Sequence, residues 1–304
     1  MRITLIGLLI LFAAGVLLSL AAGPAGIRAS SMIMRELRIP RVLLAITAGA
    51  SLAVSGCILQ AILRNPLATP YTLGISAGAG VTAGFIILSG VVMPVYLVYL
   101  CGTAGAMAAA GLTWFLAGRS RRDDSGLILA GVTVNLLGAS VLLLIEYMSP
   151  ASRLVEIVRW LMGDLAVAGY GRIIFLLPFF IAGMTLPVLR TGTLNQFLAG
   201  TDMAESRGVN TSRERFLLLL SAAVLAGGTV GAVGPVGFVG LMVPHIVRRL
   251  TGGDYRRLLP LSALGGAVLM IWADIFSRTV ISPGELPIGV ILSCSGDPSF
   301  SICS

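Results

Sequence analysis

The sequence predicts an all-helical protein that crosses a membrane about ten times. Of its 304 residues, 57% are hydrophobic and only 11% are charged, whereas soluble domains carry about 25% charged residues. Glycine is abundant, at 38 residues, and small residues let membrane-spanning helices approach one another closely. Long apolar runs recur along the chain, and no stretch has the composition of a separate soluble domain. We therefore expect one transmembrane domain over residues 1–304.

A membrane-spanning helix needs about 20 apolar residues, or fewer where neighbouring helices shield it. Residues 3–22 qualify, and no small-residue cleavage pattern precedes a soluble domain, so we expect a first span there and not a signal peptide. The ten expected spans cover about residues 3–22, 41–63, 73–89, 93–117, 126–148, 171–189, 214–233, 236–249, 259–277 and 285–304. The third and eighth are short and rich in glycine. Pro235 and Pro244 are expected at the edges of the eighth, as a short broken helix.

The placement of arginine predicts the orientation of these spans. All 21 basic residues are arginine. With the N-terminus in the cytoplasm, thirteen arginines lie on the cytoplasmic side and eight outside, the bias that cytoplasmic loops show. We therefore expect both termini inside. Four outer arginines cluster against this preference, at Arg28, Arg35, Arg38 and Arg41. Docking of an acidic partner would explain the cluster, and so would contact with lipid headgroups.

The segment 190–215 interrupts the apolar pattern with seven charged residues. Apolar residues recur in it at helical spacing, as at Leu194 and Phe197, and Gly200 and Gly208 can break or end short helices because glycine tolerates positive φ. Long apolar runs flank the segment, so we expect it on the cytoplasmic membrane surface. It could be held there by a cytoplasmic protein, or be an ordinary solvated loop.

Several classes of site are excluded by what the chain lacks. It has no lysine and hence no GxxxxGK[ST] nucleotide-binding loop, so ATP hydrolysis would need a separate subunit. A single histidine, His245, excludes a histidine-cluster metal site, and we expect it to make a structural polar contact. Cys57 and Cys101 lie in apolar runs, as buried thiols do. No interleaved basic and aromatic residues indicate a nucleic-acid groove.

Two long stretches carry a family resemblance. Residues 38–80, RIPRVLLAITAGASLAVSGCILQAILRNPLATPYTLGISAGAG, and residues 234–260, GPVGFVGLMVPHIVRRLTGGDYRRLLP, closely resemble the membrane permease of the type II ATP-binding-cassette (ABC) importers for iron-siderophores, haem and cobalamin. The resemblance continues in order and covers nearly the whole chain, through LILAGVTVNLL (127–137), WLMGDL (160–165), LNQFLAGTDMAESRGV (194–209), ADIFSR (273–278) and ELPIGV (285–290).

The resemblance implies a type II ABC importer permease fold and an assembly. Two permease copies, as a homodimer in the cytoplasmic (inner) membrane, would surround a central pathway that works by alternating access. Two ABC ATPase subunits would carry ATP and Mg²⁺, and an extracytoplasmic binding protein would deliver the substrate. This chain would hold no metal or cofactor and perform no covalent chemistry. The substrate is left open among siderophores, haem, cobalamin and an oxyanion.

The resemblance also implies which residues form the cytoplasmic gate and the contact with the ATPase. In RNPLATP, prolines bracket a polar turn at the cytoplasmic end of the second span, and the resemblance places the gate there and in the loop between the fourth and fifth spans. The matching gate positions are Asn65, Leu67, Asp124 and Ser125. The ATPase would grip the segment 190–215, with matching positions at Leu198, Gly200, Ala204, Glu205, Arg207 and Gly208.

On the outer face, the resemblance implies docking of acidic residues of the binding protein onto permease arginines. The matching positions are Arg38, Arg41 and Arg278, and the planar guanidinium of arginine pairs bidentately with a carboxylate. Asp274 lies one helical turn before Arg278, and an i,i+4 ion pair would relieve the cost of burying this acid. Such a pair competes with an outward-pointing Arg278.

The C-terminus departs from the pattern, because the polar run after ELPIGV suits a membrane span badly. One choice of codons for residues 293–304, read from its third base, encodes LLGRPFFLYLL, a normal span end for the family. We therefore expect the span 285–304 to be altered by a frameshift, with the activity in doubt.

The sequence leaves two rival functions open. A secondary transporter driven by an ion gradient would favour intramembrane acidic relays, for which Glu146 and Asp274 are few. An intramembrane enzyme would need a His/Asp/Glu constellation that a chain with one histidine lacks.

Overall fold

The computed structural model describes residues 2–21, 30–91, 93–118, 124–166, 168–281 and 284–294. These residues form helices joined by short loops and contain no strand. The helices are α1 (Arg2–Ala21), α2 (Ser31–Ile33), the π-helical turn η1 (Met34–Arg38), α3 (Ile39–Ile62), the 3-10 turn η2 (Pro70–Leu73), α4 (Ile75–Ser89), α5 (Val95–Ala117), α6 (Asp124–Met148), α7 (Ala151–Leu161), α8 (Gly171–Leu189), α9 (Thr191–Leu198), α10 (Thr201–Ser206), α11 (Thr211–Val233), α12 (Val239–Thr251) and α13 (Tyr255–Thr279). Residues 288–294 are also helical.

Seven helices in the described part of the chain are long and apolar enough to cross a membrane. This confirms an all-helical, multi-pass membrane protein. The third and eighth expected spans are the short helices α4 and α12, with 15 and 13 residues. At 1.5 Å per residue they are only about 20 Å long, against a hydrocarbon core of about 30 Å. The polar run after residue 294, with the proposed frameshift, lies outside the described residues.

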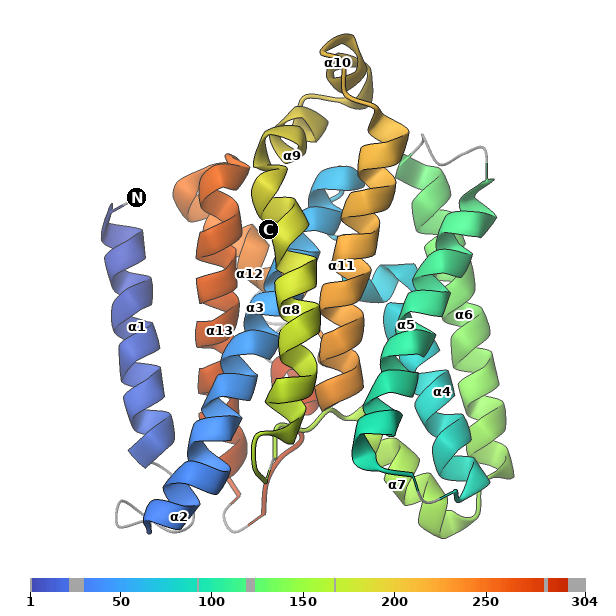
Figure 1. Ribbon diagram of the computed structural model, residues 1–304, viewed down its shortest axis with the longest axis vertical. Coiled ribbons are helices and arrows are strands. Elements are labelled where there is room, and N and C mark those ends of the chain that lie inside the picture. The colour runs from blue at the N-terminus through green and yellow to red at the C-terminus, as the bar shows by residue number, and fades with distance from the viewer. Residues whose placement is uncertain are drawn as a thin grey trace.

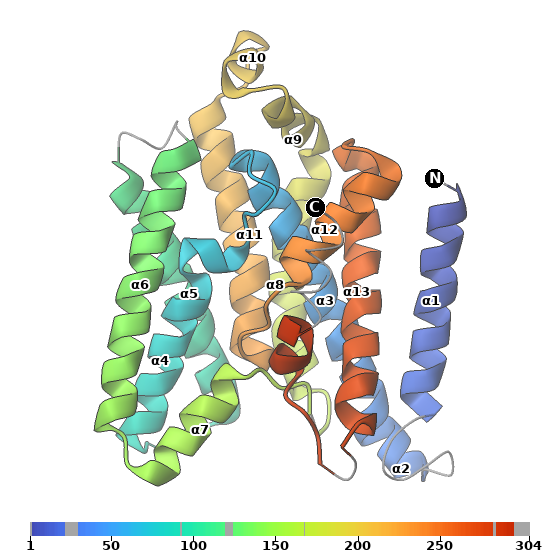
Figure 2. The same ribbon diagram turned by 180° about the vertical axis from the view of Figure 1, so that it is seen from behind.

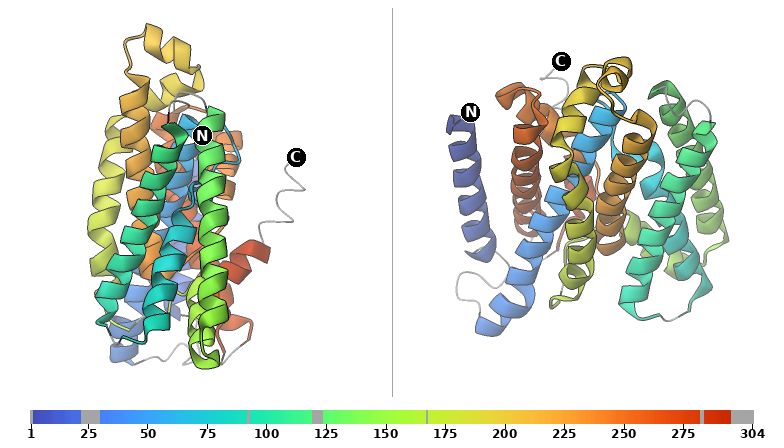
Figure 3. Two further views of the ribbon diagram at one scale, coloured as in Figure 1. Left: turned by 90° about the vertical axis from the view of Figure 1, so that its right-hand side faces the viewer. Right: turned by 45° about the horizontal axis from the view of Figure 1, so that its top comes forward.

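The helices form a bundle with two distinct ends (Figure 1). At one end α9 and α10 project beyond the other helices, and α1 begins at this same end. At the other end lie α2 and α7 (Figure 2). Helix α3 is central, since 20 of its 24 residues are buried, and it packs on α11, α12 and α13. Helix α1 lies at the edge and packs mainly on α13 (Figure 3).

Glycine pairs bring α3 into backbone contact with its neighbours. A Cβ on Gly56 would lie 1.9 Å from the carbonyl oxygen of Gly240 in α12, and a Cβ on Gly49 would lie 2.2 Å from that of Gly266 in α13. Any side chain at these positions would force the helices apart. Gly240 thus gives the close approach expected of the glycine-rich eighth span.

The prediction that Pro244 marks the edge of the eighth span is wrong, because this proline lies inside α12. Proline has no N–H, so the carbonyl of Gly240, four residues earlier, loses its helical donor. The side-chain amide of Gln60 in α3 donates to that oxygen at 3.3 Å. A buried glutamine therefore satisfies the acceptor that the proline leaves open.

The charged segment 190–215 has the structure that its pattern predicts. It forms α9 and α10, and Gly200, at φ +113°, separates them. Gly208, at φ +82°, follows α10. Both glycines occupy conformations that other residues rarely adopt.

Candidate functional site

At the end of the bundle opposite α9 and α10, buried arginines and carboxylates form a cluster. Arg41, near the start of α3, is shared between two acids. Its Nε donates to Oδ1 of Asp274 in α13 at 2.7 Å. The rest of its guanidinium forms a bidentate pair with Glu285, at 2.9 Å from Nη2 and 3.1 Å from Nη1. The side chain of Asp274 is only 1% exposed, whereas that of Glu285 is 35% exposed.

The other two arginines expected at this face join the same cluster. Arg278 pairs with Asp274 at 2.9 Å, which is the i,i+4 ion pair anticipated from the sequence, and it donates to Oγ of Ser19 in α1 at 2.6 Å. Arg38 donates to backbone carbonyls in the last turn of α1, including that of Ala21 at 3.2 Å. The fold therefore brings Arg38, Arg41 and Arg278 together, and all three are buried. Their role in docking stays a prediction.

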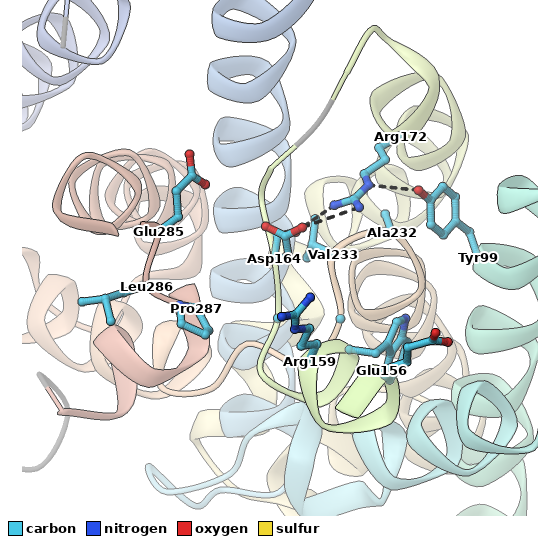
Figure 4. A pocket seen from close by; sticks show the side chains of 13 residues that line it. Tyr99, Glu156, Arg159, Asp164, Arg172, Ala232, Val233, Glu285, Leu286 and Pro287 are labelled. Atoms are coloured by element: carbon cyan, nitrogen blue, oxygen red, sulfur yellow. Dashed lines mark hydrogen bonds and ion pairs between the residues drawn. The ribbon is translucent and has the colours of Figure 1, made fainter. Parts of the chain in front are cut away.

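A cavity of about 500 Å³ opens beside this cluster. Its walls come from α7, the start of α8, the end of α11 and the segment 285–287 (Figure 4). Arg172 of α8 braces one wall, since it donates to the hydroxyl of Tyr99 at 2.9 Å and lies 3.7 Å from the carboxylate of Asp164 (Figure 4). Glu285 lines the cavity as well as holding Arg41, so the ion-pair cluster and the cavity share a residue.

The predicted gate residues lie at the opposite end. Asn65 and Leu67 form a compact turn after α3, in which Oδ1 of Asn65 accepts from the backbone N–H of Leu67 at 2.9 Å. Arg64, just before this turn, has φ +46°, which is unusual for a residue with a side chain. Asp124 and Ser125 begin α6 at the same end of the bundle (Figure 1). Their role as a gate stays a prediction.

The residues expected to contact the ATPase differ in their exposure. Leu198 is 40% exposed at the end of α9, and Glu205, Arg207 and Gly208 are exposed in and after α10. Ala204, on the inner face of α10, is fully buried, so it can support this surface but cannot touch a partner. Gly200, between α9 and α10, is partly buried. The predicted positions therefore comprise four exposed residues, one partly buried glycine and one buried supporting residue, and their role in binding the ATPase stays a prediction.

An ion pair and an aromatic contact anchor this segment to the bundle. Arg190 pairs with Glu214 at 3.1 Å across the segment. The guanidinium of the buried Arg215 lies 5.8 Å from the ring centre of Phe197 in α9, within the range of a cation–π contact. The segment is therefore joined to the bundle as an ordered structure.

Three features were missed from the sequence. Helix α7 is amphipathic and separate from the span before it, although Pro150 at its N-cap could have indicated a new helix. Glu285 was quoted within ELPIGV without a role. Asn195 lies in the motif LNQFLAGTDMAESRGV, yet nothing in the sequence indicates its contacts with residues 59 and 60 positions away.

The described residues contain no group of three or more His, Cys, Asp or Glu side chains that could hold a metal ion. His245 is half-buried in α12. Cys57 is fully buried, as expected, and Cys101 is partly buried.

Comparison with known proteins identifies the family. The FecCD transport family matches residues 3–303. An uncharacterized ABC transporter permease protein of Bacillus subtilis, YvrB, is 41% identical over 276 residues, which are 89% of this chain and 78% of that protein. The hemin transport system permease HmuU of Yersinia pestis is 37% identical over 272 residues, 88% of this chain and 81% of the relative. The vitamin B12 import system permease BtuC of Vibrio cholerae is 37% identical over 267 residues, 87% and 80% of the two chains.

Solved structures agree with these relatives. An inward-facing metal-chelate type ABC transporter superposes with a TM-score of 0.92 at 28% identity, over 100% of this chain and 99% of the other. PsaBC of Streptococcus pneumoniae, solved in complex with Fab, gives a TM-score of 0.61 at 16% identity over 87% and 90% of the chains, which bears on the fold alone. The match along nearly the whole sequence and the whole fold shows that this chain belongs to the FecCD transport family.

Proposed function

We propose that this protein is the membrane permease subunit of an ABC importer that moves a metal chelate into the cytoplasm. The observation that carries the proposal is the end-to-end match to a metal-chelate type ABC transporter, at a TM-score of 0.92. Permeases named for hemin, Fe(3+)-citrate and vitamin B12 transport are similar over more than 85% of this chain. The substrate class is therefore a metal chelate such as an iron-siderophore, haem or cobalamin.

The proposal includes an orientation in the cytoplasmic membrane. Helices α9 and α10 and the start of α1 face the cytoplasm, and the arginine cluster faces outward. The excess of arginine at the cytoplasmic end supports this orientation. The chain then crosses the membrane ten times. Seven crossings are the long apolar helices, two are the short helices α4 and α12 together with the loops that precede them, and the last begins at residue 285.

The proposed assembly contains two copies of this chain, two ABC ATPase subunits and an external binding protein. The ATPases bind the surface of α9 and α10, which projects from the bundle (Figure 1). ATP binding moves these helices. That movement shifts the cytoplasmic gate formed by Asn65 and Leu67 with Asp124 and Ser125, so that the pathway between the two copies opens alternately to each side.

Docking of the binding protein occurs at the arginine cluster by exchange of ion-pair partners. Arg38 is held by backbone carbonyls of α1, whereas Arg41 and Arg278 are held by carboxylates of this chain, so a carboxylate that arrives at Arg41 must displace an internal one. Glu285 is the exchangeable partner because its side chain is 35% exposed, whereas Asp274 is 1% exposed and held by two arginines. Since Glu285 also lines the outer cavity, its release changes the wall of that cavity.

The ion-gradient alternative gains no support. A proton or cation relay needs intramembrane acids that can change their charge or partners. Asp274 accepts a hydrogen bond from Arg41 at 2.7 Å and forms an ion pair with Arg278 at 2.9 Å, so it is already committed to two partners within this chain. Glu146, the other acid considered, lies near the end of α6.

Association with an ATPase tests the proposal. We expect an affinity-tagged copy of this chain, co-expressed with an untagged copy and with the ABC subunit, to retain both through purification. Native mass spectrometry should then give a complex of two permeases and two ATPases. A chain that purifies alone under the same mild detergent would contradict the proposed function.

A further inference from the structure

Helix α9 connects the projecting part of the segment 190–215 to the bundle, because it packs on the ends of α3 and α13 (Figure 2). Two of its side chains, Leu194 and Phe197, are fully buried among apolar neighbours. Apolar contacts of this kind hold a helix in place but have little directionality. The directional contact comes from Asn195, which lies between these two residues.

Both ends of the Asn195 carboxamide bind the first residues of α13. Its Nδ2 donates to Oδ1 of Asp254 at 2.8 Å, and its Oδ1 accepts from the backbone N–H of Tyr255 at 2.8 Å. Asp254 is the N-cap of α13 and also accepts from the N–H of Arg256 at 3.1 Å. The amide offers a donor and an acceptor side by side, which an ionised carboxylate of the same shape cannot do. The bond from Asn195 lowers the pKa of the Asp254 carboxyl, because it stabilises the charged form of this N-cap.

Tyr255 continues the contact into the bundle. It is fully buried, and its hydroxyl donates to the backbone carbonyl of Cys57 in α3 at 3.2 Å and accepts from Nη2 of Arg248 in α12 at 2.9 Å. A buried tyrosine hydroxyl needs such partners. Cys57 lies fewer than two helical turns before the end of α3, where the turn of Asn65 and Leu67 begins.

We propose that Asn195 is the positioning residue that transmits movement of the ATPase-binding helices to the cytoplasmic gate, through Asp254 and Tyr255 to the end of α3. The inference rests on the proposed function, because it presumes that an ATPase moves α9 and α10. It goes further by assigning the transmission to one side chain and to a continuous set of hydrogen bonds. These bonds fix the position of α9 relative to α13, and the tyrosine fixes α13 relative to α3 and α12.

The test uses an exchange of side chains. In Asn195→Asp, two carboxylates face each other and the directional contact is lost. In the double variant Asn195→Asp/Asp254→Asn, the new amide at 254 can donate to the new carboxylate at 195, which still accepts from the N–H of Tyr255. In the parent, one oxygen of Asp254, Oδ1, accepts from both Asn195 and Arg256. The amide at 254 must therefore rotate so that its nitrogen donates to residue 195 while its oxygen accepts from the N–H of Arg256. Asparagine is as good an N-cap as aspartate, so α13 then keeps its cap. Asn210→Asp, the same chemical change at the N-cap of α11, is the matched control.

The measurement is the rate at which a water-soluble maleimide labels Leu67→Cys in the full complex with its ATPases, with and without ATP and vanadate. Cys101, Cys294 and Cys303 are replaced by serine in this background. We expect a nucleotide-dependent change in labelling in the parent and in Asn210→Asp. In Asn195→Asp the nucleotide-dependent change in labelling rate should shrink roughly tenfold, because the loss of one hydrogen-bonded contact weakens the coupling by about that factor. The double variant should restore the change.

A second variant tests the same hydrogen bonds at a buried residue, away from the surface that binds the ATPase. Tyr255→Phe keeps the ring and removes the hydroxyl, and we expect it to reduce the labelling change as Asn195→Asp does. Full nucleotide-dependent labelling in both Asn195→Asp and Tyr255→Phe would overturn the inference, and so would a double variant that behaves like Asn195→Asp. If the parent fails to retain the ATPase, the proposed function fails instead, and co-purification of the ATPase records that result separately.

Discussion

Replacement of Glu285 by glutamine should tighten docking of the binding protein. Arg41 is held by Asp274 on one side and by Glu285 on the other. If an incoming carboxylate takes the place of Glu285, the internal ion pair competes with docking. Glutamine keeps the size and hydrogen-bonding capacity of the side chain but removes the charge, so it weakens the competitor.

The size of the effect follows from the exposure of the pair. The Glu285 side chain is 35% exposed, and ion pairs open to solvent are worth about 0.2–1 kcal/mol. Since 1.4 kcal/mol corresponds to a factor of ten, docking should tighten by up to about fivefold in Glu285→Gln. The same change at Asp274 should act differently. That acid is 1% exposed between two arginines, and removal of one member of a buried ionic group costs about 3–5 kcal/mol.

The assay is the affinity of the binding protein for the detergent-solubilised complex, measured by surface plasmon resonance at two salt concentrations. We expect tighter docking in Glu285→Gln, weaker docking in Arg41→Glu, and weaker docking of the parent at high salt, because charge pairing is screened. Asp274→Asn should lower the thermal stability of the chain. Unchanged affinity in both Glu285→Gln and Arg41→Glu would refute the exchange, and would leave the arginines as structural or lipid-contacting residues.

Three further predictions concern packing, coupling and pH. Gly56→Ala should destabilise the chain by about 1–3 kcal/mol, because the new Cβ would lie 1.9 Å from a carbonyl oxygen of α12. Gly111→Ala, where a Cβ would meet nothing within 4 Å, should be neutral or stabilising by about 0.5–1 kcal/mol. Thermal unfolding in detergent compares the two variants, and equal effects would contradict the packing. Arg207→Glu, on the exposed surface after α10, should weaken retention of the ATPase without lowering the unfolding temperature, and wild-type yield of the ATPase would count against that surface. The hydrogen bond from Asn195 lowers the pKa of Asp254 in the folded protein. The stability that this bond adds is therefore complete above the ordinary aspartate pKa and is lost as the pH falls through the lowered folded-state pKa. Asn195→Leu should remove this acid-dependent part of the profile of melting temperature against pH, and an unchanged profile would show that the bond does not form.

The fold was largely predictable, because a membrane imposes simple rules. Apolar length gave most of the spans, and the glycines of the segment 190–215 gave the two short helices. The edge of the eighth span was wrong at Pro244, because proline was taken only as a helix breaker. Inside a bundle, a neighbouring side chain can satisfy the carbonyl that proline leaves open, as Gln60 does for Gly240.

The site was predictable in part. The outer arginines were found as a cluster that breaks a topological preference, and the i,i+4 spacing of Asp274 and Arg278 gave one ion pair. The sharing of Arg41 between Asp274 and Glu285 joins residues that are 233 and 244 positions apart in the sequence. Local spacing carries no information about such contacts, and the same holds for the bond of Asn195 to the start of α13.

The most direct test of the central claim is uptake by proteoliposomes that contain this chain, its ATPase and its binding protein. The probes are ⁵⁵Fe-citrate, a ⁵⁵Fe-hydroxamate siderophore, haemin and radiolabelled cobalamin, each offered with ATP on the ATPase side of the membrane. We predict that at least one probe accumulates, that uptake stops without ATP or the ATPase, and that vanadate abolishes it. Uptake that persists without the ATPase and follows an imposed proton or sodium gradient would contradict the account.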